Sequence, residues 1–155
     1  MKNNKGFSLV ELIVVIAIMA VLVGFLAPQF LRYVDKARMS IDIQNVTLLC
    51  HTVETYAADV TRHGNEIPAQ STIELYRTSH AVDPENVSAD SQYWEYSLEN
   101  AGITDYYLRS DSWFADPSQP IVITAYELNG MPYFEESNVK EGLSILKGDR
   151  YTDDE

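Results

Sequence analysis

Cysteine is nearly absent from this sequence, since Cys50 is the only one in 155 residues. A single cysteine excludes an intrachain disulfide. The apolar residues around Cys50 follow a helical spacing, which favours a buried structural thiol over a reactive one.

Motifs for catalysis and metal binding are also scarce. The three histidines, His51, His63 and His80, have no metal-ligand spacing, and a Cys–His zinc site needs more than one cysteine. The sequence has no Gly-rich phosphate loop and no nucleophile elbow. We therefore predict that the chain is not an enzyme and uses no cofactor or metal.

Basic residues become rare after the first quarter of the chain. The formal net charge is −12, and residues 39–155 hold 21 acidic side chains against six basic ones, which leaves that region near −15. An acidic surface repels phosphate backbones, so we predict no nucleic-acid partner. It fits a domain exposed outside the cell.

What the sequence does have is a long uncharged run, the 20 residues from 12 to 31. As a helix it would extend about 30 Å, the thickness of a bilayer core. Lys2 and Lys5 precede it. Residues 24–30 contain no A-x-A-like cleavage pattern, which argues against a secretory signal removed after the apolar region. A membrane-spanning helix is the prediction.

Glu11 stands at the start of this run, where a carboxylate costs a few kcal/mol on insertion scales. A buried carboxylate needs a cationic partner or it neutralises, and no Lys or Arg lies within the run. An alternative is that Glu11 simply lies at the level of the lipid headgroups.

Residues 6–12, Gly-Phe-Ser-Leu-Val-Glu-Leu, resemble the cleavage and assembly motif of type IV pilins and pseudopilins. The resemblance is close over about the first 60 residues. It implies that a prepilin peptidase cuts between Gly6 and Phe7 and methylates the new amine of Phe7. It also implies that Glu11 pairs with that amine on a neighbouring subunit, and Pro28 falls where the family often has a helix-loosening proline.

The resemblance implies a structural subunit of a type IV pilus, with a pseudopilin of a type II secretion or DNA-uptake system as the alternative. A membrane-anchored sensor or enzyme domain is a third, weaker hypothesis. The implied partners are copies of the chain in a helical filament, prepilin peptidase, a membrane assembly platform and minor pilins. The implied location is the cytoplasmic membrane, then an extracellular filament with the head domain outside.

The chain departs from the family in one respect, because many pilins of Gram-negative bacteria carry a disulfide that Cys50 alone cannot form. Some pseudopilins hold calcium in a C-terminal loop, and Asp105, Asp111 and Asp116 offer a conceivable site. Scattered acids in an acidic loop are usually solvated, so we predict no metal there.

Apolar residues at helical spacing continue the helix through residues 30–62, with a stripe that faces a core and a polar opposite side that includes Asp42. The stripe consists of Val46, Leu49, Val53, Tyr56 and Val60. Gly64-Asn65 and Pro68 are typical helix-ending residues.

Local signals predict the rest of the head. Residues 71–74 have the form of a capping box, which predicts a short helix to about Ser79. A second helix is expected from Ser88 to Gly102, with Trp94, Leu98 and Ala101 on one face. Residues 106–109 could form a short strand.

The strongest β signal lies in residues 121–136, where Asn129-Gly130 predicts a tight hairpin that places Tyr126 opposite Tyr133. Pro132 favours an edge position for the returning strand.

Together these patterns predict an α+β, pilin-like fold, in which a long N-terminal helix packs its amphipathic half on a small antiparallel sheet. The expected divisions are a removed leader (1–6), a transmembrane and filament-core half of the helix (7–31) and a globular head (32–155).

Overall fold

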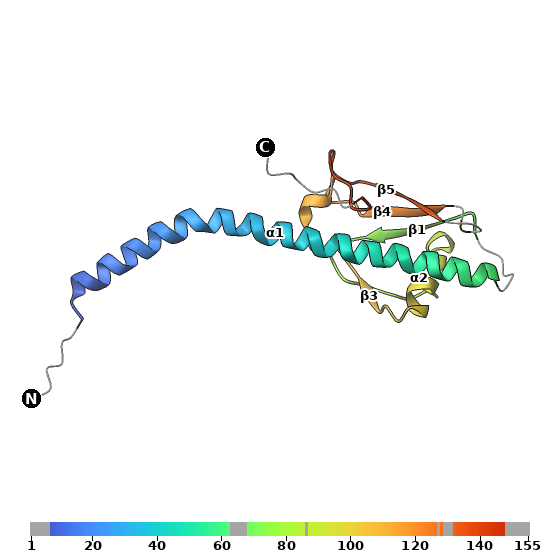
Figure 1. Cartoon of the computed structure of the whole chain (residues 1–155), viewed down its shortest axis with the longest axis horizontal. Helices are drawn as coiled ribbons and strands as arrows, with labels where there is room; N and C mark the ends of the chain where they lie inside the picture. The colour runs from blue at the N-terminus through green and yellow to red at the C-terminus, as the bar shows by residue number, and fades with distance from the viewer. Residues whose placement is uncertain (1–6, 63–67, 86, 127, 129–131, 148–155) are drawn as a thin grey trace, which may run out of the picture. The chain divides into compact units, whose positions relative to one another are not determined.

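The computed structural model describes residues 7–62, 68–85, 87–126, 128 and 132–147. The chain divides into two compact units, Met1–Lys36 and Ala37–Glu155. The described elements are one long helix, a second helix, a short 3₁₀ turn and five strands, in the α+β arrangement that the sequence predicts (Figure 1).

Helix α1 runs from Leu9 to Arg62 and includes Pro28 in its interior. Within the described part of the chain it is the one helix long and apolar enough to cross a membrane, by length and composition. In the first unit its large apolar side chains are exposed, from Leu9 through Leu31. A helix with no protein against its apolar surface needs lipid or other helices around it.

The second unit is built on a three-stranded antiparallel sheet in the order β1-β4-β5. The strands are β1 (Gln70–Leu75), β4 (Ile121–Tyr126) and β5 (Tyr133–Ser137). Helix α2 (Ala89–Asn100) packs against β1. A separate two-stranded sheet joins β2 (His80–Ala81) to β3 (Asp105–Tyr106), and the 3₁₀ turn η1 covers Asp111–Trp113.

The core of this unit lies between α1, α2 and the three-stranded sheet. The stripe of α1 behaves as predicted at Val46, Leu49 and Val53, which are buried, and Tyr56 is half-buried. The side chain of Val60 and the helix-ending Gly64-Asn65 lie outside the described residues. The inward-facing members of β1 and β4, together with Trp94 and Trp113, complete the core.

The predicted helix over residues 71–79 is wrong, because residues 70–75 form β1 instead. The side chains of β1 alternate between buried and exposed, with Ser71, Ile73 and Leu75 pointing inward. The Ser71 hydroxyl donates to the carbonyl of Asp90 at 2.6 Å and caps no helix. Pairing with β4 along the whole strand, from Gln70↔Tyr126 to Leu75↔Ile121, overrides the local capping pattern.

The second predicted helix is confirmed as α2, and Gly102 ends it in the left-handed region with φ of 74°. Trp94 and Leu98 are buried as expected, but Ala101 is exposed because it caps the helix. The short strand near residue 106 exists as β3, although it covers only Asp105–Tyr106.

The hairpin is also confirmed in its register, because Tyr126 pairs with Tyr133 and their rings stack at 5.1 Å. Strand β5 lies at the sheet edge, as Pro132 suggested. The turn dipeptide Asn129-Gly130 lies outside the described residues.

Candidate functional site

The N-terminus of α1 is capped by the side chains of Ser8 and Glu11. The backbone N–H of Ser8 donates to Oε2 of Glu11 at 2.9 Å, and the backbone N–H of Val10 donates to the Ser8 hydroxyl at 3.3 Å. A Ser or Thr followed three residues later by Glu is the capping-box pattern. The carboxylate also lies where the helix dipole favours negative charge. Glu11 therefore has a hydrogen-bond partner within its own chain.

Sequence reasoning assigned Glu11 a role in assembly but missed that Ser8 holds it. The signal was available, because Ser8-Leu9-Val10-Glu11 is a local capping pattern. Phe7, whose amine the resemblance implicates, has a side chain that is 80% exposed. Gly6 lies outside the described residues. Phe7 and Glu11 therefore both lie at the exposed N-terminal end of α1.

Pro28 lies within α1, and the helix continues on both sides of it. Its ring removes one backbone N–H, so the carbonyl of Gly24 loses its usual donor four residues on. A looser helix at this point remains a prediction. The side-chain amide of the next residue, Gln29, donates to the Tyr33 hydroxyl about one turn further along, at 3.4 Å.

The prediction for Asp42 in the head is wrong. The sequence placed this residue on the polar side of the helix, but the structure buries it completely. Its carboxylate accepts from the backbone N–H groups of Arg109 and Ser110, at 2.8 and 2.9 Å, and from Nε1 of Trp113 at 3.2 Å. Burial raises the pKa of Asp42, against the opposing effect of these three donors. This residue ties α1 to the segment before η1.

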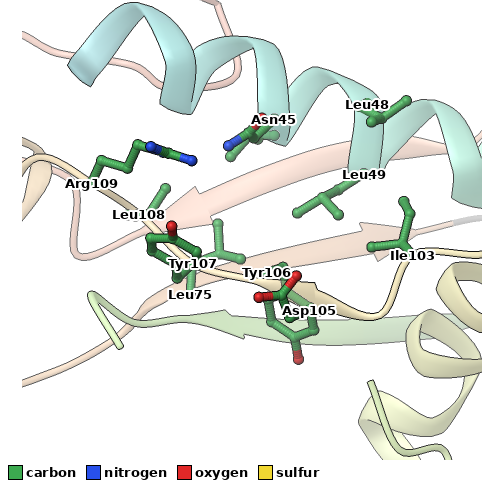
Figure 2. Close-up of a pocket in the computed structure, with 11 residues that line it drawn as sticks. Asn45, Leu48, Leu49, Leu75, Ile103, Asp105, Tyr106, Tyr107, Leu108 and Arg109 are labelled. Carbon is green, nitrogen blue, oxygen red and sulfur yellow. The ribbon is translucent and has the colours of Figure 1, made fainter. Parts of the chain in front are cut away.

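A groove of about 220 Å³ lies beside Asp42, between α1 and the segment 103–109 (Figure 2). Its floor is apolar, and Arg109 and Asp105 are its charged lining residues. The guanidinium of Arg109 also lies over the Tyr107 ring, 5.4 Å from the centroid. The lining contains no serine, cysteine or histidine, and the groove offers apolar contact together with one charge of each sign.

The three aspartates considered for calcium have protein partners instead. Asp105 accepts from the Ser79 hydroxyl, Asp111 pairs with Arg77 at 2.7 Å, and Asp116 accepts from the backbone and hydroxyl of Ser118. Among the residues that the structure describes, no group of three His, Cys, Asp or Glu side chains could hold a metal ion.

Cys50 is buried and free, as predicted. Burial raises its pKa to about 12, so the nucleophilic thiolate is almost absent at neutral pH. The predicted burial of Cys50 is therefore confirmed.

One family model and three curated relatives match the chain. Residues 1–27 match the model of the prokaryotic N-terminal methylation motif. The chain is 42% identical over 60 residues to the prepilin peptidase-dependent protein A of Clostridium perfringens, covering 37% of this chain and 43% of that protein.

Two fimbrial proteins of Pseudomonas aeruginosa are each 32% identical over 72 residues, covering 46% of this chain and 44% of theirs. The chain thus spans less than half the length of these curated relatives. No solved structure matches it significantly. The family model, over residues 1–27, includes the segment that carries Ser8 and Glu11.

Proposed function

We propose that this chain, which carries the N-terminal methylation motif, is a structural subunit of a type IV pilus. Support comes from the motif at residues 1–27 and from relatives named for fimbriae and for dependence on prepilin peptidase. The exposed apolar surface of α1 in the first unit supports membrane residence before assembly and helix packing after it.

In this proposal prepilin peptidase removes residues 1–6 and methylates Phe7. Residues 7–31 are the membrane-spanning and filament-core half of the helix, and residues 32–155 form the head outside the cell. Copies of the chain, a membrane assembly platform and minor pilins are the partners. The chain stays in the cytoplasmic membrane until it enters an extracellular filament.

The observation that carries the proposal is the hydrogen bond from the Ser8 N–H to Glu11. It satisfies one carboxylate oxygen in the single chain but supplies no positive charge. A neighbour's N-terminal ammonium at Phe7 offers a positively charged donor, which adds the attraction of opposite charges that a neutral N–H cannot supply. Assembly would then exchange a cap within the chain for an ion pair between chains, in a medium of low dielectric constant.

Two substitutions of Glu11 separate its charge from its capping role. Glutamine at N3 completes a capping box as glutamate does, but it cannot form an ion pair. We expect Glu11→Gln and Glu11→Ala both to be cleaved and both to lose filaments, as scored by immunoblot and electron microscopy. Normal filaments from Glu11→Gln cells, with none from Glu11→Ala cells, would show that Glu11 acts through the cap alone.

Processing has its own test. Gly6→Val should block cleavage and leave the full-length chain in the membrane, because the resemblance places the cut after Gly6. The intact mass and N-terminal sequence of protein from its own cells should begin at Phe7, with the mass of one added methyl group. A chain that retains residues 1–6 in every compartment would contradict the proposal at its first step.

A pseudopilin of a secretion or DNA-uptake system is the second candidate. One observation supports this second candidate. The motif and the name of the Clostridium relative both concern processing, and neither specifies the kind of filament. Electron microscopy distinguishes the two, because a pilin gives long surface filaments and a pseudopilin a short rod in the envelope.

A further inference from the structure

The second unit contains a cavity of about 300 Å³ whose wall is acidic and aromatic, and which shares Tyr106 with the groove of Figure 2. Segments distant in sequence form it: the end of β1, strand β2, the start of α2, and β3. Its size fits a small organic ligand.

Two carboxylates, Glu74 and Glu95, line this cavity, and its wall includes no lysine or arginine. Arg77 is the nearest base in sequence to Glu74, and it pairs with Asp111 at 2.7 Å. Glu95 is 1% exposed and accepts from the backbone N–H of Asp83 at 3.0 Å and from the Tyr106 hydroxyl. These neutral donors leave its negative charge without a cation in the wall.

Three aromatic rings line the same cavity, those of Tyr76, His80 and Tyr106. The His80 and Tyr106 rings pack against each other, with their centroids 5.3 Å apart and their planes inclined at 44°. The Tyr76 hydroxyl donates to Glu74 at 2.7 Å, which places the third ring next to a carboxylate. Burial and the bond to Glu95 raise the pKa of Tyr106, which keeps its hydroxyl protonated as a donor.

We propose that this cavity binds an organic ammonium ion. Aromatic faces attract cations through the ring quadrupole, and quaternary ammonium ligands are recognised by such rings together with nearby carboxylates. An anionic ligand would meet two carboxylates and no lysine or arginine, and a neutral one would leave Glu95 without a counter-charge. The charge near −15 of residues 39–155 also raises the local concentration of cations.

The test uses the full-length chain in non-ionic detergent micelles, with choline as the probe and titration calorimetry as the readout. The neutral isostere 3,3-dimethylbutan-1-ol has the same shape without the charge, and micelles without protein provide the blank. We expect choline to bind with a Kd of about 1 mM and the isostere at least about tenfold more weakly.

Three variants locate the binding. Glu74→Gln removes one charge from the wall, and Tyr76→Leu removes one ring; both side chains are at least partly exposed, so the fold should survive. Each should weaken choline binding about five- to tenfold. Glu135→Gln is the matched control, because Glu135 is exposed on β5 outside the cavity wall and its loss changes the net charge equally.

Circular dichroism melting of each variant checks that it is folded before titration. Equal affinity for choline and its neutral isostere would overturn the proposal, as would the absence of binding heat. The proposal would also be overturned if Glu135→Gln lost as much choline affinity as Glu74→Gln, because general attraction to an acidic surface would then explain the binding.

Discussion

At the scale of single residues, Asp42 is the clearest case of a charged side chain used to build the fold. It is fully buried on α1 and accepts three hydrogen bonds from the 109–113 segment. A carboxylate that accepts several N–H bonds recovers part of the free energy that its desolvation costs. Asp42 therefore fixes the position of the 109–113 segment, which contains Arg109 of the groove, against the helix.

Replacing Asp42 should be costly. Asp42→Ala leaves two backbone N–H groups and the Trp113 indole without their acceptor, so we expect the free energy of unfolding to fall by about 3 kcal/mol. Gln44→Ala, an exposed position two residues along the same helix, should change it by less than about 0.5 kcal/mol. Denaturant titration in micelles, followed by tryptophan fluorescence, measures both. Similar small changes in the two variants would contradict this role for Asp42.

The structural role of Asp42 could not be predicted from the sequence, whereas the capping role of Glu11 could. The donors to Asp42 are 67 to 71 residues further along the chain, and only the folded structure brings them together. A polar residue on an otherwise polar helix side gives no signal of burial. Glu11 lies in a local motif, and its capping partner is three residues away. Local partners are readable from sequence and distant ones are not.

At the scale of elements, the same distinction separates the correct predictions from the wrong one. Helix α2 has a glycine at its end, and the β4–β5 register follows from a turn dipeptide, so both depend on neighbours in sequence. Strand β1 depends on β4, about 50 residues later, and its Ser71-Thr72-Ile73-Glu74 start mimics a capping box. Tertiary pairing outweighed a local propensity worth about 1 kcal/mol.

The end of β5 shows how one side chain joins two elements. Asn138 has a positive φ of 61°, and its Nδ2 group donates to the carbonyls of Asp116, Gln119 and Pro120. Its Oδ1 accepts from the backbone N–H of Asp116 at 2.8 Å. The loop that leads into β4 is therefore closed by a single amide side chain.

Two substitutions of Asn138 separate its side-chain bonds from its backbone conformation. Glycine tolerates positive φ, so Asn138→Gly should lose only the hydrogen bonds, or about 2 kcal/mol of unfolding free energy. Asn138→Ala should lose about 1 kcal/mol more, because alanine adopts the left-handed region at a cost. Denaturant titration measures the free energy of unfolding of the wild type and the two variants. If the alanine variant is as stable as the glycine variant, the backbone conformation contributes nothing.

At the scale of the whole molecule, the dominant property is the uneven charge. Residues 39–155 hold 21 acids and six bases. The ion pairs of the described residues include Arg77 with Asp111 and His51 with Glu54, and the second needs a protonated histidine. Like charges thus outnumber attractive pairs over the head. Self-repulsion of this kind keeps a protein soluble but opposes the compact state.

Salt should therefore stabilise the head. The Debye length falls from about 30 Å at 0.01 M to about 8 Å at 0.15 M, so repulsion between separated surface carboxylates is screened while short contacts are affected less. We expect the Tm of the full-length chain in non-ionic micelles to rise by about 3 °C over this range of potassium chloride. Circular dichroism measures the change, and empty micelles control for detergent effects. A Tm that falls over the same range would mean that attractive pairs outweigh the repulsion within the head. In the filament proposed above, repulsion of the same kind would also act between neighbouring heads, so a rising Tm predicts that salt favours assembly.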